Sequence, residues 1–276
     1  MKPMVHSEAL LLTFDPDPAS RTMRDLLTSS YGFRRTSETF EGKPVFERDA
    51  ISLVTLGVES INAEGLERHF RAKLFVFLSK HESASRMPAL LTHVPGNWGD
   101  ETKYGGLPRR ICIAPASALR ASLLTLKQIV DERGMEYSYG LEVTHHGPYV
   151  DTTPSMFVEL GSDSSRWTDR RAAEACVLAA LEAANAEAVE EVFIGIGGGH
   201  YAPAFTRFVL NSRASVSHII PRHALRNAGG EDVLMAMRRS LEVPKGALLD
   251  WSGIDKEDRG RLPKLLESLK ITYRKI

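Results

Sequence analysis

Cysteine is scarce in this chain of 276 residues, and its scarcity argues against two kinds of site. Cys112 and Cys176 are the only cysteines, they stand far apart, and neither belongs to a Cys-x-x-Cys pair. A disulfide framework or a zinc site made of thiolates would need more cysteines at closer spacing. A serine or cysteine nucleophile is weakly supported too, because there is no Gly-x-Ser-x-Gly motif and neither cysteine has a polar setting. We therefore expect a protein of the reducing cytoplasm.

Long apolar runs and an excess of charge of one sign are also missing. No segment approaches the roughly 20 apolar residues of a membrane span. The first residues run through a short apolar stretch into Asp15 and Asp17, which fits a first strand better than a signal peptide. Because the formal net charge is zero, a nucleic-acid partner could only meet a local basic patch. We expect no membrane contact and a single domain over residues 1–276, with two closely packed domains as the alternative.

Short apolar runs bounded by turn residues predict buried strands. They occupy residues 9–14, 51–56, 73–79, 156–160, 192–197 and 215–220. Helical patterns alternate with them, at residues 20–31, from Pro115 to Gly134, at 169–185 and at 231–241. This alternation predicts an α/β fold of three αβα layers around a mixed, mostly parallel sheet, with catalytic loops at the carboxyl ends of strands.

Residues 81–110 are the least regular part of the chain. They mix turn residues with two histidines, His81 and His93. A loop of that length is uncommon inside a compact domain unless it has a function. We therefore expect residues 81–110 to form an active-site loop region within the domain.

Polar side chains of the kind that bind metals stand at four expected strand ends. These ends have the sequences SKHES at 79–83, THVPGNWG at 92–99, EVTHHGP at 142–148 and GIGGGHYAP at 195–203. Imidazoles and carboxylates are the usual ligand set of hydrolytic metal sites. Their recurrence at strand ends predicts one shared site.

His145 and His146 are neighbours in the chain, close to Glu142. In a regular strand adjacent side chains point to opposite faces, so the two rings could not share one metal ion. Gly147 and Pro148 end the strand, and a loop geometry could let both rings converge. The pair then suits one zinc ligand and one partner that positions it or acts as a general acid. A hydrogen-bonded histidine of the core or surface is the alternative.

Glu159 and the glycines from 195 to 199 each allow more than one reading. Glu159 closes a buried apolar run, where a carboxylate needs a cation or an ion-pair partner, so metal ligand, general base and ion pair all remain open. The dinucleotide-binding pattern would need a glycine at His200 and an acidic residue about 20 positions later, and neither is present. The glycines instead suggest a sharp turn whose N–H groups could approach a phosphate or an oxyanion, or simply a tight turn.

A water molecule activated by a metal ion is then the simplest nucleophile. Trp98, Tyr104 and Trp167 stand in loop-like settings and could stack on a nucleobase, although packing is the more common role for each such residue.

Taken together, the motifs resemble those of the D-aminoacyl-tRNA deacylases of the archaeal and plant type. The likeness runs from about residue 7 to past His218 and Pro221, and it depends on THHGP and GGGHYAP occurring together. The resemblance implies an αβα fold akin to peptidyl-tRNA hydrolases, zinc exopeptidases and related phosphorylase-like or hydrolase-like folds. It also implies Zn²⁺, two ions per chain, a monomer without an obligate protein partner, and hydrolysis of the ester that joins a D-amino acid to the acceptor end of tRNA.

Residue chemistry divides the candidate site into three groups. We expect metal ligands among His81, His93, His145, Glu159 and His200. We expect catalytic roles for Glu142, Thr144, His146 and Tyr201. We expect substrate contacts from Asn97, Trp98, Gly197, Gly198 and Gly199. Two other functions remain open: a zinc-dependent amidase or exopeptidase on the same kind of sheet, and a non-catalytic RNA-binding module.

Overall fold

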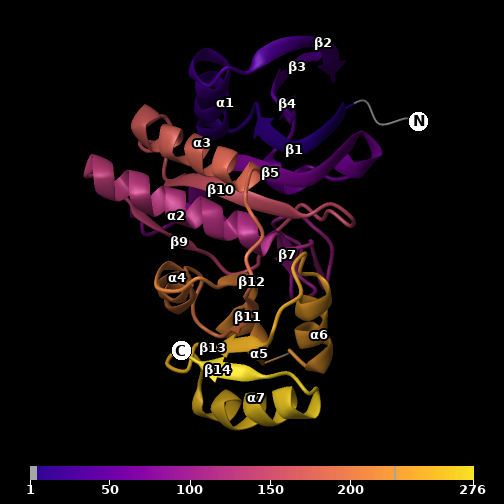
Figure 1. The fold of residues 1–276 in the computed structure, drawn as a ribbon, viewed down its shortest axis with the longest axis vertical. Coiled ribbons are helices and arrows are strands. Elements are labelled where there is room, and N and C mark those ends of the chain that lie inside the picture. Colours follow the sequence, from indigo (N-terminus) through magenta and orange to yellow (C-terminus); the bar gives the residue numbers. More distant parts are fainter. Residues whose placement is uncertain (1–4, 227) are drawn as a thin grey trace.

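Two sheets organise the computed structural model, which describes residues 5–226 and 228–276. The larger sheet has eight strands in the order β2-β3-β4-β1-β5-β10-β6-β9, and the smaller has four in the order β12-β11-β13-β14. Figure 1 shows the larger sheet and its helices at the top and the smaller sheet below them. A separate pair, β7 (Gly96–Asn97) and β8 (Arg110–Ile111), lies beside the junction.

The larger sheet is parallel at its centre and has antiparallel pairings on both sides of that centre. Strands β4, β1, β5 and β10 run parallel, β6 is antiparallel to β10, and β2 and β3 form an antiparallel edge next to β4. Central strands are buried on both faces, which explains their continuous apolar runs. The strands are β1 (Val5–Phe14), β2 (Arg34–Phe40), β3 (Lys43–Arg48), β4 (Ile51–Leu56), β5 (Phe70–Glu82), β6 (Ala89–His93), β9 (Ser138–Leu141) and β10 (Ser155–Ser162). Two short turns of 3₁₀ helix, η1 (Ser60–Asn62) and η2 (Leu66–Arg68), precede β5.

Three helices lie together on one face of the larger sheet: α1 (Pro18–Ser30), α2 (Ala116–Arg133) and α3 (Arg170–Ala184). Helix α3 packs against both α1 and α2 (Figure 1). Asp17 and Asp169 cap α1 and α3 by accepting hydrogen bonds from the first free N–H groups. Gly134 ends α2 in the left-handed conformation that glycine adopts most easily.

The smaller sheet is parallel throughout and has helices on both faces. Its strands are β11 (Val192–Ile196), β12 (Ser215–Ile220), β13 (Ala247–Leu249) and β14 (Tyr273–Lys275). Side chains alternate along β11, so Phe193 packs with α4 (Pro203–Leu210) while Ile194 faces the opposite layer. That layer contains α5 (Arg222–Leu225), α6 (Gly230–Arg238) and α7 (Lys256–Ser268). The αβα arrangement is therefore clearest around this sheet.

The predicted α/β class and the mostly parallel sheet are confirmed. All six predicted strands fall in β1, β4, β5, β10, β11 and β12, and the four predicted helices correspond to α1, α2, α3 and α6. The prediction that residues 81–110 are irregular is wrong in part, because β6 lies within them between β10 and β9. A run as short as ALLTH takes its strand conformation from long-range pairing with β10. None of the described helices combines the length and the apolar composition needed to cross a bilayer.

Candidate metal centre

Strands β5 and β10 place the first two candidate ligands side by side. They pair in parallel with Glu159 opposite Ser79, which brings His81, two residues later on β5, over the same carboxylate. Ser79 Oγ donates a hydrogen bond to Glu159 Oε1 at 2.9 Å, and His81 Nδ1 lies 3.3 Å from Glu159 Oε2. All three side chains are buried. The register of two central strands therefore fixes this half of the site.

Strand β6 and the segment that follows β9 bring the next donors to the same edge. His93 is the last residue of β6, and Glu142 directly follows β9, its parallel partner. The pairing continues past both strands, because Glu142 N donates to Thr92 O at 3.1 Å and Gly96 N donates to His146 O at 2.6 Å. His93 and the residues from 142 to 146 are thus held as an extension of the sheet.

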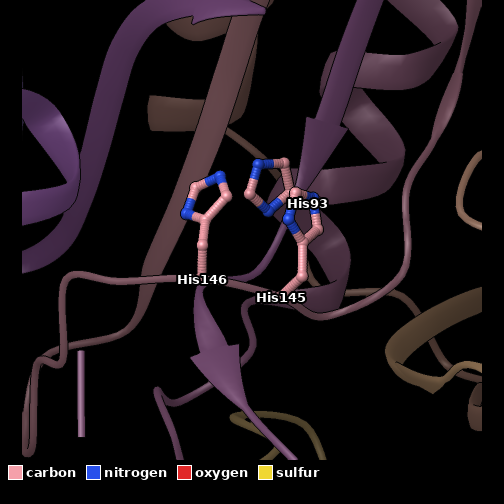
Figure 2. Close-up of side chains that lie close together, drawn as sticks. All are labelled: His93, His145 and His146. Carbon is pink, nitrogen blue, oxygen red and sulfur yellow. The ribbon is translucent and has the colours of Figure 1, made fainter. Parts of the chain in front are cut away.

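His93, His145 and His146 form a cluster of three imidazoles, shown in Figure 2. Ring centroids lie 4.2 Å apart for His93 and His145, and 4.3 Å apart for His145 and His146. His146 has a φ of 41°, in the left-handed region, which turns its ring back toward its neighbour. The loop geometry expected after Glu142 is therefore present, and the two adjacent rings do converge.

Glu142 lies at the centre of the donors. Its carboxylate oxygens lie 2.9 Å from His200 Nε2, 3.4 Å from His145 Nε2 and 3.7 Å from His81 Nδ1. None of these short approaches has the geometry of a hydrogen bond, and both oxygens of Glu142 are fully buried without a hydrogen-bond partner. The Nε2 atoms of His93 and His145 are also buried without a hydrogen-bond partner. A buried carboxylate in that condition is costly unless a cation neutralises it.

The described residues contain three overlapping groups whose donor atoms are close enough to share a metal ion. They are His93 with His145 and His146, Glu142 with His145 and His200, and His81 with Glu142 and Glu159. Imidazole and carboxylate donors of this kind suit a divalent ion such as zinc. The orphaned donor atoms and the ligand chemistry thus fit a metal centre.

The protonation states of His145, His146 and Glu142 suit metal binding, whereas His81 would have to lose a proton to become a ligand. Burial and charge on His93 and His146 hold the pKa of His145 well below its usual value, and burial lowers the pKa of His146 to about 4. Both rings are therefore neutral near pH 7 and offer a lone pair. Burial alone would raise the pKa of Glu142, but His145 and His200 lower it well below its usual value. Burial alone would lower the pKa of His81, but Glu159 and Glu142 raise it to about 9.

The smaller sheet contributes His200 and Tyr201 on the turn after β11. Tyr201 donates its hydroxyl proton to Ser83 Oγ at 2.8 Å, and the same oxygen lies 3.3 Å from His81 Nε2. The side chain of His200 is 44% exposed, so this side of the cluster is open to solvent. Residues separated by more than one hundred positions in sequence therefore meet across the junction of the two sheets.

One known protein family has a model that matches most of this chain. The family model for D-aminoacyl-tRNA deacylase matches residues 68–274, which include every candidate donor described above. The chain belongs to the D-aminoacyl-tRNA deacylase family. A family member from Pyrococcus furiosus is 34% identical over 270 residues and covers 96% of this chain and 98% of its own. Another, from Methanocaldococcus jannaschii, is 34% identical over 245 residues and covers 84% and 90%.

A solved structure shares the fold of this deacylase family member over nearly its whole length. The crystal structure of a conserved protein of unknown function has a TM-score of 0.87, with 25% identity, and covers 98% of this chain and 95% of its own. The two-sheet architecture is therefore found in a crystallised relative as well.

Three residues expected to act on substrate lie outside the donor cluster in this deacylase. Thr144 Oγ1 lies 3.0 Å from His218 Nδ1, and both side chains are buried. Asn97 Nδ2 donates to Gly105 O at 2.9 Å and so holds a loop. Trp98 is only 8% exposed and packs in the core of the smaller sheet. All three brace the segments that carry the donors.

The three candidate substrate-binding glycines differ from one another. Gly197 and Gly198 have φ values of 104° and 81°, and their N–H groups donate to Ile220 O and Gly253 O. A Cβ at Gly197 would collide with Ile254, so this turn requires glycine there. Gly199 has open space where a Cβ would stand. The first two glycines shape the turn that delivers His200, and Gly199 is the one that a ligand could approach.

Sequence reasoning left Asp17 out of the site. Its buried carboxylate accepts hydrogen bonds from Ser20 N at 3.0 Å and from Lys80 N at 2.7 Å, and Lys80 lies between Ser79 and His81 on β5. Burial raises the pKa of Asp17 to about 6. An aspartate before Pro18 is a recognisable helix cap, but its bond to a residue 63 positions away is visible only in the folded chain.

Proposed function

We propose that this protein hydrolyses the ester bond between a D-amino acid and the 3′-terminal ribose of tRNA, using a water molecule activated by Zn²⁺. Membership of the D-aminoacyl-tRNA deacylase family supports the substrate. The single observation that supports the metal is Glu142, a buried carboxylate surrounded by imidazole nitrogens with no hydrogen bond to either oxygen.

His81, His93, His145, Glu159 and His200 would hold the metal together with Glu142. The three overlapping donor groups offer room for two ions per chain. When bound, Zn²⁺ would lower the pKa of a coordinated water toward neutrality and polarise the ester carbonyl. Ser79, which donates to Glu159, would orient that carboxylate.

The chain's own groups would move the protons. Glu142 is ionised and can accept the proton of the attacking water. The proton that Glu142 accepts must reach the ribose oxygen as the ester C–O bond breaks; His146, which is neutral because its pKa is about 4, can take up that proton and deliver it there. Tyr201 is 40% exposed at the open side, where its hydroxyl can donate to the developing oxyanion. Gly199 leaves room for the substrate beside His200, whereas Thr144, Asn97 and Trp98 would act through the segments that they brace.

We further propose that residues 1–276 act as one catalytic unit and as a monomer. Donors from both sheets of the same chain meet at Glu142, so no second copy is needed to assemble the site. Both cysteines are free and buried, which supports a reducing compartment such as the cytoplasm. The proposed likeness to peptidyl-tRNA hydrolases and zinc exopeptidases stays a prediction.

Metal analysis combined with a deacylation assay tests this function. We expect about one to two zinc ions per chain, hydrolysis of D-Tyr-tRNA well ahead of L-Tyr-tRNA, and loss of activity in chelator that added Zn²⁺ restores. Full activity without metal would remove the metal from the proposal. Cleavage of small peptides without ester cleavage would indicate the amidase or exopeptidase, and RNA binding without hydrolysis would indicate a binding module.

A further inference from the structure

The structure separates three aromatic residues that the sequence alone left equivalent. Trp98 is buried in the core of the smaller sheet. Trp167 is half-buried, and its Nε1 donates to His81 O at 2.9 Å. Tyr104, in contrast, is 60% exposed. Contacts within the protein account for the two tryptophans, whereas the solvent-exposed ring of Tyr104 is available to bind a partner.

Tyr104 belongs to a turn that the protein holds firmly. Asn97 of β7 donates to Gly105 O at 2.9 Å and to Leu107 O at 3.3 Å (Figure 1 places β7). Gly105 has a φ of 77°, and a Cβ there would collide with Ile61 O. The residues from Thr102 to Leu107, which we call the Tyr104 turn, therefore present the exposed ring on a fixed backbone.

The Tyr104 turn is attached directly to the candidate metal centre. Gly147 N donates to Tyr104 O at 2.9 Å, and that N–H belongs to the peptide that joins His146 to Gly147. The ring of His146 lies 4.3 Å from that of His145. One hydrogen bond thus links the exposed aromatic to the segment that carries two of the proposed site residues.

A positive charge accompanies the ring. Lys103 Nζ lies 5.4 Å from the centroid of Tyr104, and both side chains are exposed. An aromatic face beside an ammonium group matches a single-stranded nucleic acid, whose bases stack and whose phosphates need a counter-charge. Leu107 on the same turn is 45% exposed and widens the apolar surface.

We propose that the Tyr104 turn binds the unpaired 3′ end of the RNA substrate, with a base stacked on Tyr104 and a phosphate near Lys103. This rests on the proposed function and adds to it the surface that holds the RNA while the ester reaches the metal centre. An RNA is favoured over a peptide partner because the surface combines one rigid aromatic ring with a cation. Loss of one stacked base weakens such binding by about 10- to 100-fold.

Direct binding tests the surface without relying on hydrolysis. The probe is an RNA hairpin with an unpaired 3′ tail, compared with the same hairpin without the tail. We expect the full-length protein to bind the tailed hairpin more tightly, Tyr104→Ala to weaken that binding by about 10- to 100-fold, and Tyr104→Phe, which keeps the stacking face, to stay within about threefold. Leu241→Ala, at a position 55% exposed between α6 and β13, is the surface control.

Two further measurements separate the possible failures. Lys103→Ala should lower the slope of binding against salt concentration, as expected for the loss of about one phosphate contact, while Lys103→Arg should keep it. In hydrolysis, Tyr104→Ala should raise KM for D-Tyr-tRNA far more than it lowers kcat.

Equal binding of both hairpins, or unchanged affinity in Tyr104→Ala, overturns the proposed RNA-binding role of this surface even if deacylation is intact. Conversely, tail-dependent binding by a protein that cleaves no D-Tyr-tRNA would refute the proposed function and leave the surface standing.

Discussion

The two sheets contribute to the candidate metal centre in different ways. The larger sheet supplies His81, His93 and Glu159 from strands, and each is no more than 5% exposed. The smaller sheet supplies His200 and Tyr201 from a turn, with a His200 side chain that is 44% exposed and a Tyr201 that is 40% exposed. Strand register positions the first group rigidly, while the second group borders solvent where substrate must enter. One sheet therefore sets the donor geometry and the other completes the open side.

The segment from Glu142 to His146 belongs to neither sheet and connects both. Glu142 N donates to Thr92 O in β6, whereas Thr144 N donates to Ile219 O in β12 at 3.1 Å. Val143 N donates to His200 O at 3.0 Å. Because both sheets hold this short segment, a change in either sheet should alter the position of the Glu142 carboxylate.

Glu142→Gln should have the largest effect, because it removes the group that both sheets approach. The amide keeps the shape but loses the charge and one acceptor, so we expect a fall in kcat/KM of about 10³-fold or more together with weaker zinc retention. Steady-state deacylation and metal analysis measure the two effects. Glu136→Gln, a change on the surface, is the control. Normal turnover in Glu142→Gln would mean that the sheets do not converge on a working centre.

His93→Ala and His200→Ala compare the two sheets directly. His93 is stacked between Phe157 and His145, at centroid distances of 4.9 and 4.2 Å, so its removal leaves a cavity in the core. We expect His93→Ala to lose about 2–4 kcal/mol of unfolding free energy, whereas the unfolding free energy of His200→Ala should stay within about 0.5 kcal/mol of that of the unchanged protein. Both should lower turnover by at least about 10²-fold. Urea unfolding measures both variants. If they lost similar amounts of unfolding free energy, the assigned difference between a rigid larger sheet and an open smaller sheet would be contradicted.

The sequence predicted donor types better than donor geometry. Histidines and glutamates at strand ends identified His81, His93, Glu142 and Glu159, because parallel strands bring their carboxyl ends together. The sequence could not show that β6 lies between β10 and β9, since that order depends on pairing between residues about 50 to 70 positions apart. The sequence likewise predicted substrate contacts from Asn97 and Trp98, whereas Trp98 packs in the core of the smaller sheet and Asn97 holds a nearby loop.

Asp17→Asn tests a buried charge behind the larger sheet by its pH dependence. Burial raises the pKa of Asp17 from 3.8 to about 6, so the stability that this group contributes is complete below pH 3.8 and is lost as pH rises through 6. Asparagine has no proton to lose. The stability of Asp17→Asn relative to the unchanged protein should therefore increase with pH by up to about 3 kcal/mol, roughly half of it between pH 5 and 8.

Urea unfolding at several pH values measures this difference for Asp17→Asn. Asp255→Asn, at the exposed cap of α7 in the other half of the molecule, shows what replacing a helix-capping carboxylate does where that group is not buried. A difference between Asp17→Asn and the unchanged protein that stays constant with pH would show that the Asp17 carboxylate is solvated in the folded protein.

Thr144→Val should have the smallest effect, and it sharpens the comparison at the shared segment. Valine keeps the shape but removes the hydroxyl that contacts His218 Nδ1 at 3.0 Å and accepts from Ile219 N at 3.3 Å. Leaving a buried imidazole nitrogen unpaired costs about 1–3 kcal/mol. If β12 positions the Glu142 segment, kcat should fall by about tenfold without a change in KM. Thr125→Val removes a hydroxyl that only bonds its own helix, and it should leave kcat unchanged. Equal kcat in both variants would mean that the smaller sheet acts only through His200 and Tyr201.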